Sequence, residues 1–143
     1  MNQEVFSALS DALGRGEEVA LVTIVASSGS TPQRVGAKML VFADGRTLGT
    51  IGGGCYESDA LWKAIEALRT RTPRLVRYDL ADDFAEESGL ICGGQMQVYI
   101  EPIEPAPDLY IVGAGHVAQH LAATARPVGF RTHVLDEIGR AHV

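Results

Sequence analysis

The sequence predicts an α/β protein in which a small mixed α/β domain precedes the opening βαβ unit of a second domain. Three observations predict this fold. Short β-branched runs alternate with segments of helical periodicity over the first hundred or so residues. The proline-rich stretch EPAPD at 104–108 then has the composition of a linker. After it, LYIVGAGHVA at 109–118 joins an apolar strand to a glycine-rich turn and a helix, which is typical of a Rossmann-like domain.

The elements of the first domain follow in order from local pattern. Apolar residues at helical spacing predict a first helix that ends at Gly14 and Gly16. The run VALVTIVA at 19–26 predicts a buried strand, and the segment rich in Gly, Ser and Pro at 27–36 predicts a loop. Further strands are expected at 38–42, 47–51, 74–79 and 95–101, and a second helix is expected at 55–69.

Four segments follow from this assignment. We expect an N-terminal domain at 1–104, a linker at 105–108, an incomplete Rossmann-like domain at 109–137 and a non-native tail at 138–143. The tail, IGRAHV, resembles translated adapter from a sequencing library, which would also explain a truncated second domain; a native tail is the alternative. A single βαβ unit leaves apolar faces and strand edges uncovered, so a homo-oligomer is expected.

Composition excludes several classes of protein. The net charge of −6 and the lack of a basic patch argue against a nucleic-acid-binding protein. The first eighteen residues are polar and lack the apolar core of a signal peptide, and no apolar run is long enough to span a bilayer. We therefore expect a cytoplasmic protein that does not enter a membrane. In that compartment Cys55 and Cys92 are expected as thiols rather than as a disulfide.

The segment GTIGGGCYE at 49–57 is the first candidate site, because a strand runs into Gly52, Gly53 and Gly54 and a helix then begins. Glycines let backbone N–H groups approach a ligand closely, and a helix start favours an anion such as a phosphate. The same position favours the thiolate form of Cys55, which could then act as a nucleophile or ligate a soft metal. A packing turn with a buried, inert cysteine is an equally weighted alternative.

Two further segments could join this site. Cys92 precedes Gly93 and Gly94, and a second Cys–Gly cluster in one domain raises the chance that the two converge, although a lone buried cysteine is the commoner case. No CxxC motif is present and the first domain has no histidine, so a structural zinc site is not expected. The loop at 27–36 supplies hydroxyls and a cation that suit an oxyanion, unless it is simply solvated; these residues are Ser30, Thr31 and Arg34.

The second domain opens with the fingerprint Gly113-x-Gly115-x-x-Ala118. The first glycine allows a tight turn, the second lets the backbone approach a pyrophosphate, and the small third residue lets the helix pack on the strand. A helix at 117–126 and a strand at 130–135 follow, and Asp136 stands where an acidic residue contacts a ribose. His116 lies in the turn, where it would face a ligand or cap the helix.

Taken together and in order, four motifs resemble the XdhC/CoxI family over residues 19–136; they are GSTPQRVGAKMLV, GTIGGGCYE, CGGQMQVYIEP and LYIVGAGHVAQ. The resemblance implies an accessory protein of molybdenum hydroxylases such as xanthine dehydrogenase. Such a protein is a chaperone rather than an enzyme: it binds molybdenum cofactor (molybdopterin), protects it during sulfuration and delivers it to the apo-enzyme. The implied partners are a xanthine dehydrogenase-type hydroxylase and a sulfurating cysteine desulfurase.

By the same resemblance, the cofactor would be held by Cys55, Cys92 and the turn at Gly52–Gly54, with the loop at 30–34 in second place. Thiolates suit a thiophilic metal centre, so both cysteines are also candidate metal ligands. NAD(P) or another nucleotide would bind only to a complete Rossmann-like domain. Two alternatives stay open, a nicotinamide- or flavin-dependent oxidoreductase and an inactive fragment, although the sequence offers no acid–base pair aligned with a hydride site.

Overall fold

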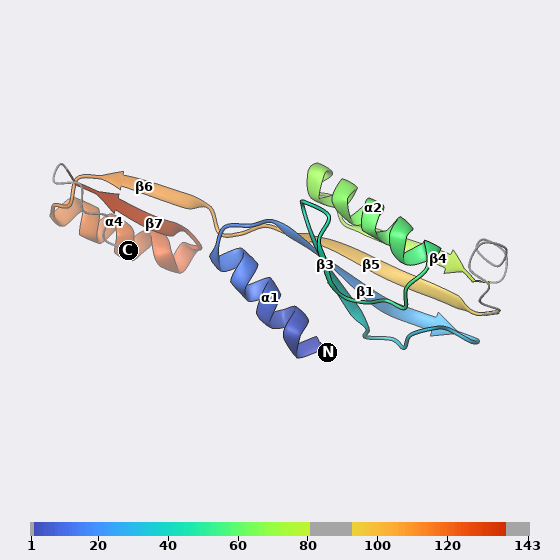
Figure 1. Cartoon of the computed structure of the whole chain (residues 1–143). Coiled ribbons are helices and arrows are strands. Elements are labelled where there is room, and N and C mark those ends of the chain that lie inside the picture. The colour runs from blue at the N-terminus through green and yellow to red at the C-terminus, as the bar shows by residue number, and fades with distance from the viewer. Residues whose placement is uncertain (1, 81–92, 137–143) are drawn as a thin grey trace. The chain divides into compact units, whose positions relative to one another are not determined.

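The computed structural model describes residues 2–80 and 93–136 (Figure 1). The chain divides into two compact units, residues 1–104 and 105–143. The expected tail at 138–143 and Cys92 lie outside the described residues. Across the part of the chain that is described, no helix is both long and apolar enough to cross a membrane.

The first unit is built on a five-stranded antiparallel sheet with the strand order β3-β2-β1-β5-β4. Two helices accompany the sheet, and α2 lies along it in Figure 1. The elements are α1 (Asn2–Gly14), β1 (Val19–Ser28), β2 (Lys38–Phe42), β3 (Thr47–Gly49), α2 (Cys55–Thr70), β4 (Arg74–Asp79) and β5 (Gln95–Ile103). The mixed α/β class expected from the sequence is confirmed.

Strand β1 is the central strand of the sheet, and the first part of its apolar run, Val19–Ile24, is buried on both faces apart from the half-buried Thr23. Alternate residues of a strand point to opposite sides of a sheet. Accordingly, Ala20, Val22 and Ile24 belong to the core cluster that contains the buried face of α2. Val19 and Leu21 belong to a second cluster with α1. The unbroken VALVTIVA run is therefore what a central strand between two helical layers needs.

Three strands of the first unit end at residues other than those expected from the sequence, and one of them, β5, runs to Ile103 instead of residue 101. Strand β1 continues to Ser28, beyond the expected end at residue 26, because it keeps pairing with β5 after a register shift between Ile24 and Ala26. Strand β3 stops at Gly49 instead of residue 51. Gly49 has φ +82°, and a Cβ there would collide with the carbonyl oxygen of Lys38, so the chain turns away from β2 at this point.

The second unit is a parallel βαβ unit, as expected. Strand β6 (Asp108–Val112) pairs in parallel with β7 (Arg131–Leu135), and α4 (His116–Ala125) connects them through a short 3-10 turn. Asp108, which the sequence assigned to the linker, is the first residue of β6. Its carboxylate accepts hydrogen bonds from Arg131 and pairs with His133, and these contacts fasten the start of β6 to β7.

Candidate functional site

The β1–β2 loop (residues 29–37) contacts both glycine clusters of the first unit. At one end of the loop, a Cβ on Gly94 would collide with the carbonyl oxygen of Ser30 and lie 2.7 Å from that of Ser28. Further along, a Cβ on Gly52 would lie 2.7 Å from Cγ of Pro32. Glycine is therefore required by close approach at both positions. Three segments that are distant in the sequence meet here.

The glycine turn (Gly52–Gly54) has an unusual backbone. All three residues have positive φ, at +126°, +79° and +81° in order. L-residues with a side chain rarely adopt this conformation, which explains why three consecutive glycines are used. Gly54 is the N-cap of α2 and has no side chain to cap the helix, so the free N–H groups at the start of the helix must be satisfied by other groups.

A carboxylate of α2 holds the glycine turn from inside. Oε2 of Glu57 accepts hydrogen bonds from the backbone N–H groups of Ile51 and Gly53, both at 2.9 Å, and from Oγ1 of Thr50 at 2.6 Å. The Thr50 hydroxyl in turn accepts the N–H of Gly52 at 2.9 Å. The chain's own anion thus engages the N–H groups of Ile51 and Gly53, and the Thr50 hydroxyl engages that of Gly52, so donors that the sequence suggested for a phosphate are already in use.

Cys55 is the first residue of α2 and directly follows the glycine turn. Its side chain is half-buried. Because Cys92 lies outside the described residues, the distance between the two thiols is not defined by the structure. The adjacent Gly93 and Gly94 are described, and Gly94 is buried between the β1–β2 loop and Leu80, whose N–H donates to its carbonyl oxygen. Within residues 2–80 and 93–136, no group of three or more His, Cys, Asp and Glu is placed to hold a metal ion.

The three polar residues of the β1–β2 loop that the sequence suggested for an oxyanion do not lie together. The Thr31 hydroxyl donates to the carbonyl oxygen of Gln33 at 2.9 Å and so shapes the loop, while Ser30 is exposed. Arg34 is exposed and lines a pocket of about 330 Å³ with Asn2 of α1. The residues of the glycine turn do not line that pocket. Arg34 therefore lies at the opposite end of the loop from its contact with Gly94.

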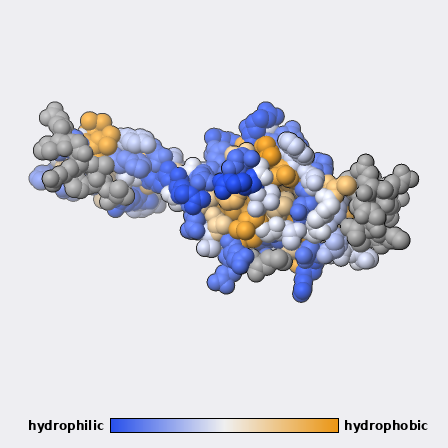
Figure 2. Space-filling view, viewed as in Figure 1, coloured by the Kyte–Doolittle hydropathy of each residue, from blue (hydrophilic) through white to orange (hydrophobic). Residues whose placement is uncertain are grey.

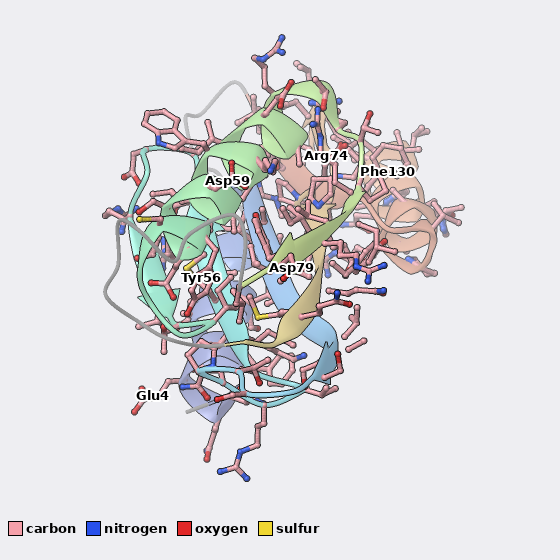
Figure 3. All side chains as sticks on the ribbon, turned by 90° about the vertical axis from the view of Figure 1, so that its right-hand side faces the viewer. Glu4, Tyr56, Asp59, Arg74, Asp79 and Phe130 are labelled. Atoms are coloured by element: carbon pink, nitrogen blue, oxygen red, sulfur yellow. The ribbon has the colours of Figure 1, made fainter. Side chains whose placement is uncertain are left out.

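A buried tyrosine pair supports α2 behind the turn. Tyr56 and Asp59 both project from α2 (Figure 3), and the Tyr56 ring lies 6.1 Å from that of Tyr78 on β4. The Tyr78 hydroxyl donates to Asp59 at 2.7 Å, and Lys63 also binds this carboxylate. Burial, and then the bond to Asp59, raise the pKa of Tyr78 well above its usual range. Burial alone would raise the pKa of Asp59, but hydrogen bonds from Lys63 and Tyr78 outweigh it and leave that pKa lowered.

The second unit places its glycine motif between β6 and α4, as the fingerprint predicts. Gly113 has φ +97° and donates its N–H to the carbonyl oxygen of Leu135, and Gly115 is the N-cap of α4. His116 is exposed and lines a pocket of about 500 Å³ together with Gly113, Gly115 and apolar side chains of β6 and α4. Asp136 follows directly after β7 and is exposed.

Glu57 is the site residue that sequence reasoning missed. Its signal was present, because an acidic residue three positions after a helix N-cap commonly reaches back to free N–H groups. Here the N-cap is a glycine, so the usual Ser/Thr-x-x-Glu pattern is incomplete. The reach of the carboxylate to Ile51, beyond the N-cap, depends on three left-handed residues in a row and could not be derived from spacing alone.

Comparison with known proteins identifies the first unit. Residues 12–79 match the XdhC and CoxI family. This unit is an XdhC and CoxI family domain. The family expected from the four sequence motifs is confirmed, and the match includes the β1–β2 loop, the glycine turn and the whole of α2.

Relatives of this XdhC and CoxI domain include proteins of Escherichia coli K12 and Bacillus subtilis 168. The uncharacterised protein YqeB of Escherichia coli K12 is 44% identical over 82% of this chain and 21% of its own length. The molybdenum cofactor insertion chaperone PaoD, also of Escherichia coli K12, is 32% identical over 71% of this chain and 32% of its own length. A Bacillus subtilis protein named as a xanthine dehydrogenase subunit is 39% identical over 61% of this chain and 27% of its own length.

A solved structure shares the fold. The crystal structure of a protein described as a xanthine dehydrogenase from Bacillus halodurans superimposes with a TM-score of 0.60 and 23% identity, over 90% of this chain and 61% of that one. The chain spans roughly a fifth to a third of the length of the curated relatives it matches.

Proposed function

We propose that this chain is an accessory factor of molybdenum hydroxylases that binds molybdenum cofactor through its first unit and acts in the insertion of that cofactor into a xanthine dehydrogenase-type enzyme. The observation that carries the proposal is the meeting of the β1–β2 loop, the glycine turn with Cys55, and Gly93–Gly94 in one unit. Its resemblance to the insertion chaperone PaoD supports this role.

The residues of this site suit molybdopterin in two respects. Cys55 offers a thiol at a half-exposed helix start, and thiolates prefer soft or thiophilic centres. Gly53 and Gly93, where a Cβ would meet nothing within 4 Å, leave room for a flat ring system to approach the backbone. When bound, the cofactor supplies a metal centre with sulfur ligands. Cys55 and Cys92 are the proposed ligands or neighbours of that centre.

The phosphate of the cofactor needs donors outside the glycine turn, since Glu57 already occupies the N–H groups of Ile51 and Gly53. We assign it to the β1–β2 loop, which exposes Ser30 at the end next to Gly94 and Arg34 at the end next to α1 as two separate candidate partners. A planar guanidinium and a hydroxyl are effective phosphate partners. In this arrangement Gly52 and Gly53 contribute shape rather than hydrogen bonds. The glycine motif of the second unit, Gly113 to Gly115 with His116 and Asp136, has no proposed part in binding this cofactor.

Protection of the cofactor during sulfuration and contact with a cysteine desulfurase are further parts of the proposal. A half-buried thiol next to the metal centre would shield the sulfur site from solvent until the acceptor enzyme is reached. Delivery then requires weak enough binding for release, so the affinity is expected to fall when an apo-hydroxylase is added.

The test is an anaerobic titration of the chain with molybdenum cofactor, followed by absorbance and by the molybdenum content of the separated protein. Wild type should bind about one equivalent, while Cys55→Ala combined with Cys92→Ala should lose roughly 10-fold or more in affinity. Thr70→Ala is the control, because Thr70 is exposed on the last turn of the same helix, away from the glycine turn. A folded wild-type chain that binds no cofactor, or a double variant that binds as tightly as wild type, would contradict the proposal.

A further inference from the structure

We propose that Glu57 is a positioning residue for the cofactor site: its carboxylate replaces an external anion in the glycine turn and thereby fixes the direction in which Cys55 is presented. This inference rests on the proposed function, since it concerns how the same site is held. It assigns the turn a different role from the phosphate cradle that the glycine pattern suggests.

The geometry concentrates three donors on one oxygen atom. Oε2 of Glu57 takes the N–H groups of Ile51 and Gly53 and the hydroxyl of Thr50, all between 2.6 and 2.9 Å. Bonds to an ionised carboxylate are about twice as strong as bonds between neutral groups. Among the described residues, Oε1 of Glu57 accepts no hydrogen bond. Oε2 therefore makes all the bonds to the turn, and the amide nitrogen of a glutamine at this position could take the place of Oε1.

The hydrogen bonds that Glu57 accepts act directly on the backbone next to Cys55. Glu57 lies on the first turn of α2, two residues after Cys55, and its bonds reach back across the turn to residues 50–53. Residues before Cys55 in the turn are thus hydrogen-bonded to a residue after Cys55 in the helix. Glycine adopts positive and negative φ about equally readily, so the three glycines could change conformation easily without these hydrogen bonds.

Packing alone does not hold the turn along its full length. A Cβ on Gly52 would meet Tyr56 and Pro32, so this residue is enclosed, but a Cβ on Gly53 would meet nothing within 4 Å. Gly53 is therefore open on the side that a Cβ would take, and its N–H is held by the hydrogen bond to Glu57. Loss of the carboxylate should release the segment between the enclosed Gly52 and the helix, which is where Cys55 is attached.

The experiment compares Glu57→Ala with Glu57→Gln. Glutamine can place its single carbonyl oxygen at the position of Oε2 and its amide at the unbonded position, so it keeps the acceptor and loses the charge. Alanine loses both. Glu66→Ala is the matched control, because Glu66 lies on the same helix and pairs with Arg74 at 3.1 Å, away from the turn.

Two readouts are taken on each folded variant, the affinity for molybdenum cofactor and the rate of Cys55 alkylation by iodoacetamide across pH, followed by mass spectrometry of the Cys55 peptide. We expect Glu57→Ala to bind cofactor about 10- to 100-fold more weakly. Its alkylation rate at the most alkaline pH of the series should rise several-fold as the half-buried thiol becomes accessible. Glu57→Gln should recover most of both values.

Chemical rescue separates positioning from general stability. Acetate can enter the space left in Glu57→Ala and accept the same N–H groups, so it should restore both readouts, whereas chloride at equal ionic strength should not. The inference is overturned if folded Glu57→Ala matches wild type in both readouts. It is also overturned if acetate does not restore Glu57→Ala and Glu57→Gln is as impaired as Glu57→Ala. If wild type itself binds no cofactor, the proposed function fails, and the alkylation series alone decides whether Glu57 positions Cys55.

Discussion

The two units of this chain bury their apolar side chains to different extents. In the first unit, α2 and α1 contribute to separate core clusters with opposite-facing residues of β1, and side chains such as Leu40 and Ile100 are fully buried. In the second unit, Val112 is 86% exposed and Val117 is 81% exposed. On the face seen in Figure 2, apolar side chains (orange) interrupt the hydrophilic surface of both units. The first unit is a self-sufficient core, whereas the βαβ unit has apolar surface that other groups would have to cover.

The contrast extends to polar groups. The first unit satisfies the exceptional backbone of its glycine turn with an internal carboxylate, so its donors are already matched before any ligand binds. The second unit leaves its glycine motif beside a pocket lined mostly by apolar side chains, with no comparable internal anion among the residues that line it. A glycine-rich turn before a helix therefore does not by itself indicate a phosphate site.

The largest expected effect sharpens the comparison of the two cores. Leu40→Ala removes a fully buried side chain of the first unit and should lower the free energy of unfolding by about 2–5 kcal/mol. Leu121→Ala removes a side chain that is 46% exposed in the second unit and should cost roughly 1 kcal/mol or less. Urea unfolding followed by far-UV circular dichroism reports on both units, and the fluorescence of Trp62 on α2, the chain's single tryptophan, reports on the first. Equal losses for the two variants would mean that the units share one core.

A smaller effect is expected within the glycine turn. Gly52→Ala brings a Cβ against Tyr56 and Pro32 at a φ of +126°, so it should cost about 2–3 kcal/mol. Gly53→Ala meets open space and carries only the left-handed strain, about 1–2 kcal/mol. Thermal unfolding of the two variants gives the difference. The reverse order would show that the turn is held by Gly53 rather than by the packing around Gly52.

The smallest effect concerns pH. Burial and the bond to Asp59 raise the pKa of Tyr78 in the folded chain. Its contribution to stability is therefore fully present below the ordinary tyrosine pKa of about 10, and it is lost as the pH rises above that value. Tyr78→Phe should cost about 1 kcal/mol at neutral pH through loss of the hydrogen bond, and it should flatten the fall in stability at alkaline pH. An unchanged alkaline slope, measured by urea unfolding between pH 8 and pH 11 or so, would assign that fall to other groups.

Sequence pattern predicted the elements well and their contacts poorly. The β-branched run of β1, the helical spacing in α2 and the fingerprint before α4 are local signals, and each element lies within a few residues of its expected bounds. The early end of β3 depends on the positive φ of Gly49 and on its close approach to the Lys38 carbonyl of another strand, where a Cβ would not fit. The contact of the β1–β2 loop with Gly94 likewise joins segments some sixty residues apart, and no periodicity encodes it.

The same limit applied to the candidate site. Cysteine and glycine positions were readable, because their chemistry is carried by residue type. The hydrogen bonds of Glu57 were not, because they require a backbone path that only the folded turn provides. Residue identity thus predicted which groups are available, while the structure determined which of them are already in use.

The central position of β1 also determines the order in which the strands of the sheet can pair during synthesis. One neighbour, β2, leaves the ribosome soon after β1, but the other, β5, is made about seventy residues later. Until β5 is made, one edge of β1 has no partner strand. Nascent chains with such an unpaired apolar edge are prone to incorrect pairing. Because Gly94 immediately precedes β5, the loop contact that completes the candidate site is among the last to form. A nascent chain of this protein would therefore complete its candidate site only as β5 is made and joins the sheet.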